Sequence, residues 1–298
     1  MRIVSLLPSA TEIAFLLGLG DQLVGVTHEC DWPPAARSIR RVSWSSLPPL
    51  AEPAEVDRLV SESVTGGASI YELDRDAIRE LSPDLVLTQD LCAVCAVPAG
   101  HLRAALDVLG CDAEVVSLDP SSLDEVLGCI VTVAKATGTE AHAHELVSEL
   151  SRRLERVRQA VSGRPRPRTL ALEWGDPPYN GGHWVPEMIE VAGGEAVLGS
   201  PGVPSTRLSW ADIATSSPET VVFMPCGYDL DAACAEAPRV ATRAELGHAT
   251  RFAAANASAY FSRPGPRLVD GVEALASLLH PGVVAPRVDD AVSVLESP

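Results

Sequence analysis

The chain has 298 residues, 46% of them hydrophobic, which is enough for two hydrophobic cores. Its formal net charge of −17 argues against a protein that binds nucleic acid without sequence preference, because such a protein needs a basic face for the phosphates. Seven cysteines, an odd number in a long chain, do not suggest a disulfide framework. No run of apolar residues reaches the ~18–20 that a membrane span needs.

The first half of the chain alternates short apolar runs with amphipathic segments, as α/β proteins do. Ser9 and Glu12 fit a capping box, which predicts a helix that ends at Gly18 or Gly20. The remaining elements follow from periodicity and from Gly and Pro breaks. We expect strands at residues 3–7, 23–27, 84–88 and 114–118, and helices at residues 74–81, 99–109 and 122–136.

A long helix is predicted for residues 140–161. Its apolar residues recur at spacings of three and four, and no Gly or Pro interrupts it. At ~1.5 Å per residue it would be roughly 33 Å long, about the width of a domain. We expect this rigid helix, residues 140–163 with its end, to join an N-terminal lobe of residues 1–139 to a C-terminal lobe of residues 164–298.

Arginines crowd the end of this helix and the Pro-rich segment after it, from Arg152 to Arg168. Basic residues suit the negative end of a helix dipole. We interpret this segment as a solvated helix end followed by a stiff linker.

The second half of the chain repeats the alternation. We expect strands at residues 169–174, 219–224 and 251–255, and helices at residues 186–192, 209–214 and 267–279. The predicted fold class is therefore α/β, with two Rossmann-like lobes joined by one long α-helix.

Chemically distinctive side chains follow the predicted strands directly. They are His28, Cys30, Cys92, Cys95, Trp174 and Cys226. Ligands of open α/β sheets bind outside the carboxyl ends of the strands, so we expect these residues to line one cleft between the lobes. Trp32, Trp44 and Trp184 also fall in predicted loops, where they either anchor the loops or form flat apolar walls for a large planar ligand.

Several motifs resemble those of one known group. They are residues 2–12 (RIVSLLPSATE), 24–31 (VGVTHECD), 182–187 (GHWVPE), 225–227 (PCG) and 260–267 (YFSRPGPR). The chain resembles the cobalamin-binding-protein group of the helical-backbone (class III) substrate-binding proteins of ABC importers. The resemblance implies two α/β lobes joined by one long helix, with a cobalamin or related metal-chelate ligand between them.

We expect the ligand to contact aromatic residues and one carboxylate of the cleft: Trp32, Trp44, Glu173, Trp174, Trp184, Tyr228 and Phe261. For Glu173 the sequence leaves two roles open, a cleft carboxylate or a hydrogen-bond partner at the strand end. The expected partners are the small-molecule ligand and an ABC permease, with no nucleic acid and no membrane span.

Cysteine chemistry supplies the alternative interpretation. Cys30, Cys92, Cys95 and Cys226, with His28, could hold zinc or an iron–sulfur cluster in a cytoplasmic metalloprotein or enzyme. The same cysteines are also compatible with a redox pair, a corrinoid contact, or small buried side chains. The sequence leaves open whether the protein catalyses any reaction.

The first residues predict a location. Met1 to Leu7 contain one basic residue and a short apolar run that stops at Pro8, which indicates a strand and not a secretion signal. We therefore expect a cytoplasmic protein, and a periplasmic or cell-surface one only if a leader was removed.

Overall fold

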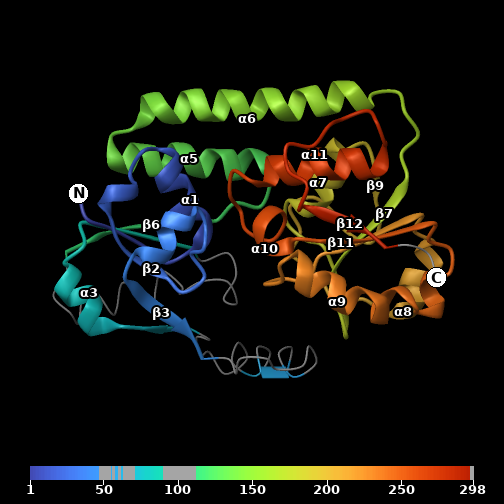
Figure 1. Cartoon of the computed structure of the whole chain (residues 1–298), viewed down its shortest axis with the longest axis horizontal. Helices are drawn as coiled ribbons and strands as arrows, with labels where there is room; N and C mark the ends of the chain where they lie inside the picture. Colours follow the sequence, from blue (N-terminus) through green and yellow to red (C-terminus); the bar gives the residue numbers. More distant parts are fainter. Residues whose placement is uncertain (47–54, 56–57, 60–61, 63–70, 90–111, 296–298) are drawn as a thin grey trace. The chain divides into compact units, whose positions relative to one another are not determined.

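The computed structural model describes residues 1–46, 55, 58–59, 62, 71–89 and 112–295 (Figure 1). The chain forms two compact units. The first unit comprises residues 1–120 and 125–147, and the second comprises residues 121–124 and 148–298. Each unit contains its own six-stranded sheet with helices. The lobe boundaries suggested by the sequence, at residues 139 and 164, stay a prediction.

The sheet of the first unit is mostly parallel. Its strand order is β4-β3-β2-β1-β5-β6, and only the β3–β4 pair is antiparallel. Ile3 and Val4 of the inner strand β1 are fully buried, as residues of a parallel strand are. The strands are β1 (Ile3–Ser5), β2 (Leu23–Thr27), β3 (Arg41–Ser45), β4 (Tyr71–Leu73), β5 (Leu85–Thr88) and β6 (Glu114–Ser117).

The described α-helices of this unit are α1 (Pro8–Leu16), α3 (Arg75–Leu81) and most of α5 (Leu123–Thr137), together with the first residues of the long helix that follows α5. The predicted capping box is wrong, because α1 begins at Pro8 and Ser9 is buried inside it. Proline lacks the N–H that a cap would satisfy, so it starts a helix without one. The helix ends as predicted, at Gly18, whose φ of 77° favours glycine. The helix predicted at residues 99–109 lies outside the described residues.

The sheet of the second unit has the order β12-β11-β10-β7-β8, and β9 also pairs with β7. Strands β7, β9, β10 and β11 are parallel, while β8 and β12 are antiparallel edges. The strands are β7 (Arg168–Gly175), β8 (Pro178–Asn180), β9 (Glu195–Ala196), β10 (Thr220–Phe223), β11 (Arg251–Ala255) and β12 (Val292–Val294).

Helices cover both faces of this sheet. Figure 1 shows α7 and α11 on one face and α8 and α9 on the other. The helices are α7 (Val185–Val191), α8 (Trp210–Ser216), α9 (Leu230–Ala241), α10 (Ala257–Tyr260) and α11 (Leu268–Leu279). The sequence did not predict α9, because the buried face of this helix consists of Ala233, Ala237 and Val240, and alanines give a weak apolar period.

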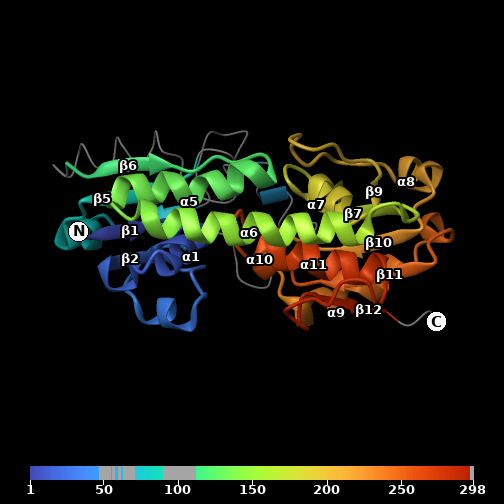
Figure 2. The ribbon, with the colours of Figure 1, turned by 90° about the horizontal axis from the view of Figure 1, so that it is seen from above.

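Helix α6 (Glu140–Val161) is the long helix that the sequence predicts, with the same bounds. It continues without a break from the first unit into the second (Figure 2). Its buried side chains include Ala143, Leu150, Leu154 and Val157, which belong to the predicted apolar stripe. Among the described residues, no helix is long and apolar enough to cross a membrane.

Candidate functional site

Two aromatic residues meet at the edge of the second sheet where its parallel strands end. Trp174 lies near the end of β7, and Tyr228 lies in the turn after β10. Their ring centroids are 5.9 Å apart at an interplanar angle of 80°, the edge-to-face arrangement that aromatic pairs prefer. Both side chains are half-buried, so each keeps an accessible part. This pair forms an apolar corner at the carboxyl ends of the parallel strands, where open α/β sheets generally bind their ligands.

Glu173, the residue before this tryptophan, holds two loops together. Its carboxylate accepts a hydrogen bond from Ser205 Oγ at 2.5 Å and one from the Gly182 N–H at 3.4 Å. Only glycine fits at position 182, because a Cβ there would lie 2.1 Å from the Ser205 backbone nitrogen. The structure shows the hydrogen-bonding role of Glu173, and its role as a cleft carboxylate stays a prediction.

His183 is held in an unusual backbone conformation beside this contact. Its φ is 52°, and hydrogen bonds fix both of its backbone groups, His183 N to Val203 O at 2.7 Å and Gly202 N to His183 O at 2.9 Å. Non-glycine residues with positive φ cluster at ligand sites, where the surrounding structure stabilises the strained conformation. The conformation therefore marks His183 as a candidate ligand contact.

The ring of His183 supports the same assignment. It stacks on the Trp184 ring with centroids 5.6 Å apart, and its buried Nδ1 has no hydrogen-bond partner among the described residues. Burial lowers the pKa of His183, so the ring is neutral at pH 7. His183 is not among the ligand contacts expected from the sequence. The sequence did offer one signal for it: His183 directly follows two glycines in the loop after a predicted strand.

Trp184 and Phe261 are buried next to His183 in the second unit. Trp184 is 5% exposed and Phe261 is fully buried, and the indole Nε1–H donates to the Phe261 carbonyl oxygen at 2.7 Å. The two residues thus connect the start of α7 to the end of α10. This buried hydrogen bond fixes the position of Trp184, on which the His183 ring stacks.

The first unit carries a second aromatic surface near the ends of β2 and β3. Trp32 and Trp44 are 47% and 44% exposed, unusually high for tryptophan. The rings of His28 and Tyr71 lie beside each other with centroids 5.9 Å apart. Trp44 belongs to strand β3, whereas the sequence predicts a loop at this position. Exposed aromatic groups of this kind mark ligand or protein contacts.

The cysteines that were candidate metal ligands have different environments. Cys30 is buried in the first unit, with its Sγ 3.0 Å from Thr11 Oγ1, and Cys226 is exposed in the second. Cys92 and Cys95 lie outside the described residues. Within the part of the chain that the structure describes, no three His, Cys, Asp or Glu side chains lie close enough to hold a metal ion. The metal and iron–sulfur assignment therefore stays a prediction.

Comparison with known proteins identifies the family. The family model described as "Periplasmic binding protein" matches residues 3–242. A Vitamin B12-binding protein of Yersinia pestis (strain Pestoides F) is 25% identical over 226 residues, which cover 74% of this chain and 68% of that protein. Another from Yersinia pseudotuberculosis serotype O:3 (strain YPIII) shows the same identity and coverage.

Solved structures confirm the two-lobe α/β fold. A periplasmic heme binding protein from Pseudomonas aeruginosa is similar with a TM-score of 0.75 and 19% identity, covering 99% of this chain and 98% of that one. The periplasmic Vitamin B12 binding protein BtuF of Vibrio cholerae gives a TM-score of 0.67 at 23% identity, covering 93% and 96%.

The expected cytoplasmic location is wrong, because the family model and the similar solved structures describe periplasmic proteins. The short apolar run before Pro8 is the inner strand β1, and it carries no information about the compartment. The substrate-receptor interpretation is supported over that of a cytoplasmic metalloenzyme. The chain belongs to the periplasmic binding protein family, as a substrate-binding protein that takes a small ligand and works with an ABC permease.

Proposed function

We propose that this substrate-binding protein takes a corrinoid, with cobalamin as the first candidate. The observation that carries the proposal is the gathering of aromatic side chains where the strands end: the Trp174–Tyr228 pair in the second unit, and exposed Trp32 and Trp44 in the first. Flat aromatic surfaces suit a large planar chelate, which offers extensive apolar faces.

The curated relatives support a corrinoid over haem. The proteins at 25% identity are Vitamin B12-binding proteins, whereas the heme-binding proteins resemble this chain at 19–22% identity and share its fold. We extend the proposal to His183, whose neutral ring, stacked on Trp184, offers the ligand a polar contact without a charge.

The test is a titration of the purified protein with cobalamin and, separately, with haem. We expect cobalamin to quench tryptophan fluorescence and to shift its own visible bands, with a dissociation constant of about 1 μM or lower. Trp174→Leu should weaken this binding about tenfold, because it removes one stacking partner. Trp44→Leu tests the first unit in the same way.

Trp210→Leu is the matched control. Trp210 lies in α8, with the Arg243 guanidinium 4.3 Å from its ring centroid, and it is not at a strand end. It should therefore leave cobalamin affinity unchanged. No response to cobalamin at tens of micromolar, or equal losses in Trp174→Leu and Trp210→Leu, would overturn the proposal. Tight binding of haem alone would change the ligand from a corrinoid to a porphyrin.

A further inference from the structure

A strongly basic surface lies at the end of α6, in a chain whose net charge is −17. Between residues 152 and 168 the sequence has seven arginines, no lysine and one acidic residue, Glu155. The sequence predicts only a solvated helix end there. The structure separates these arginines into two that are neutralised and five that are exposed.

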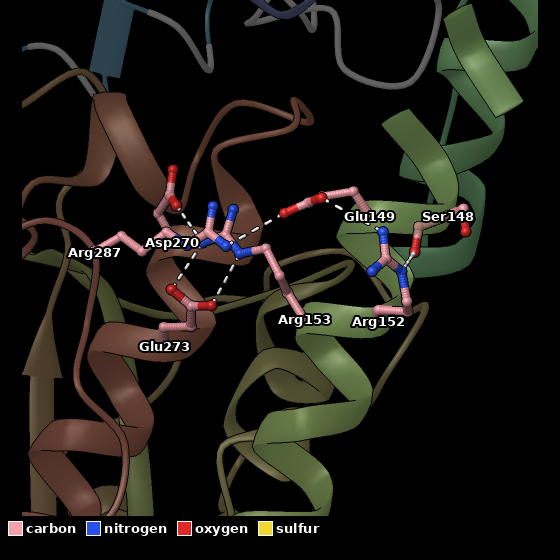
Figure 3. A network of polar contacts seen from close by, with 7 residues as sticks. All are labelled: Ser148, Glu149, Arg152, Arg153, Asp270, Glu273 and Arg287. Carbon is pink, nitrogen blue, oxygen red and sulfur yellow. Dashed lines mark hydrogen bonds and ion pairs between the residues drawn. The ribbon is translucent and has the colours of Figure 1, made fainter. Parts of the chain in front are cut away.

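Arg153 and Arg168 are the neutralised ones. Arg153 is buried and pairs with Asp270 and Glu273, while its neighbour Arg152 extends away from them toward Ser148 and Glu149 (Figure 3). Arg168 Nη1 lies 2.5 Å from Glu195 Oε1.

The five exposed arginines form a surface that we name the arginine face. They are Arg152, Arg156, Arg158, Arg164 and Arg166. Glu155 and Gln159 lie one turn apart and form a ridge along the helix. Arg152 and Arg156 lie on one side of this ridge, and Arg158 lies on the other side. Arginine stems are long enough for head groups on both sides to reach one plane.

Most of this charge is uncompensated. No carboxylate of the described residues lies within ion-pair distance of Arg156, Arg164 or Arg166. Arg152 pairs with Glu149 at 3.5 Å, and Arg158 has only Glu155 at 3.9 Å. Arg166 is fixed by two hydrogen bonds to the Gly194 carbonyl oxygen, at 3.0 and 2.8 Å.

A shallow, open depression lies beside one of these head groups, that of Arg158. The depression of about 440 Å³ is lined by Glu155, Arg158, Gln159 and Ser162. Guanidinium groups are the side chains best suited to phosphate, because their forked N–H groups match two phosphate oxygens. A phosphate group in this depression would meet the Arg158 guanidinium, and the Glu155 carboxylate beside it reduces the local positive charge.

We propose that the arginine face docks on anionic phospholipid headgroups of the membrane. Clusters of four to eight exposed basic residues bind anionic lipid surfaces, and this protein works with a permease embedded in such a membrane. A second copy of the chain is the weaker candidate, because two chains of charge −17 repel each other. The proposal is independent of the ligand and goes beyond the proposed function.

The experiment measures binding of the full chain to vesicles by co-sedimentation. Vesicles of phosphatidylcholine with about one third phosphatidylglycerol are compared with vesicles of phosphatidylcholine alone, at low salt and at about 0.5 M salt. We expect binding to the anionic vesicles only, and its loss at high salt. The triple variant Arg156→Gln, Arg158→Gln, Arg164→Gln should bind on the order of 100-fold more weakly, about fivefold for each arginine.

The matched control removes the same charge elsewhere, in the triple variant Arg37→Gln, Arg79→Gln, Arg239→Gln. These three arginines are exposed too, and Arg79 and Arg239 form ion pairs with Asp76 and Glu236 of their own helices. The control should bind anionic vesicles within about twofold of the unchanged protein. Both triple variants should keep the circular dichroism and the cobalamin titration of the unchanged protein.

Four results would overturn the proposal. Absence of binding to anionic vesicles at low salt is the first, and an equal loss in the control variant is the second. Displacement by inorganic phosphate at concentrations too low to screen charge would indicate a site for free phosphate. A dimer in light scattering that only the arginine-face variant loses would identify a second copy of this chain as the partner.

Discussion

The guanidinium group of Arg153 and the carboxylate of Glu273 meet through two parallel hydrogen bonds, Nε to Oε1 at 2.9 Å and Nη2 to Oε2 at 2.7 Å (Figure 3). Arg153 Nη2 also lies 2.5 Å from Asp270 Oδ1. Burial alone would lower the pKa of Arg153, but its hydrogen bonds to Glu273 and Asp270 raise it above the usual value. These contacts fasten the second half of α6 to α11.

Replacing this arginine should strongly destabilise the second unit. Arg153 and Glu273 are 5% and 6% exposed, so Arg153→Met leaves a buried carboxylate without its partner. Breaking one side of a buried pair costs about 3–5 kcal/mol. Urea unfolding of the variant should show the loss as a lower midpoint.

A neighbouring ion pair supplies the control for this substitution. Arg287 Nη2 lies 3.3 Å from Glu149 Oε1, and these side chains are 51% and 47% exposed. Arg287→Met should cost at most about 1 kcal/mol, because exposed pairs contribute little. Equal losses in the two variants would show that burial does not set the strength of the Arg153 contact.

His183→Asn should separate ligand binding from stability. Asparagine tolerates the positive φ of 52° at this position, so the free energy of unfolding should change by less than about 1 kcal/mol. The variant loses the ring that stacks on Trp184, and we expect cobalamin affinity to fall about tenfold. Unchanged affinity in a folded variant would remove His183 from the proposed site.

The same variant tests a pH dependence. Burial lowers the pKa of His183 in the folded protein below its ordinary value of 6.5. As the pH falls, the imidazole is therefore protonated in the unfolded chain before it is protonated in the folded protein. The stability contributed by the neutral ring is therefore present above about pH 6.5 and is lost below it. Between pH 7.5 and pH 5.5 the urea midpoint should fall more in the unchanged protein than in His183→Asn. Parallel curves for the two proteins would contradict the assignment.

Thiol reactivity should differ between two described cysteines. Cys226 is exposed, whereas burial, reinforced by the charges of Asp119 and Glu125, raises the pKa of Cys129 to about 12. Thiolates are the reactive species, so Cys129 should react slowly at pH 8. In a titration with Ellman's reagent, Cys226→Ser should remove one fast-reacting thiol and Cys129→Ser none. The reverse pattern would contradict the burial of Cys129.

Much of the fold was predictable because the decisive signals were local. The long helix of residues 140–161 and the strands of residues 23–27 and 251–255 have the bounds that their periodicity predicts. Edge strand β12 was missed, because three residues carry too little pattern. Helix α9 was missed as well, because its buried face consists mainly of alanines, which give only a weak apolar period.

The site was predictable only as a region. The sequence placed Trp174 and Glu173 at the end of a strand, and the structure has both there, because topology brings the carboxyl ends of parallel strands to one edge. Their contact with a ligand stays a prediction. The strained backbone of His183 could not be read from the sequence, since loop residues 202 and 203 impose it through their hydrogen bonds.

The amino-acid sequence by itself determined the order of helices and strands, the unbroken helix between the lobes and the chemical character of the strand ends, because each of these depends on neighbours along the chain. Only the tertiary structure decided which arginine of α6 is buried and which face water. The carboxylates of Asp270 and Glu273 lie more than a hundred residues from Arg153, and packing alone brings them together.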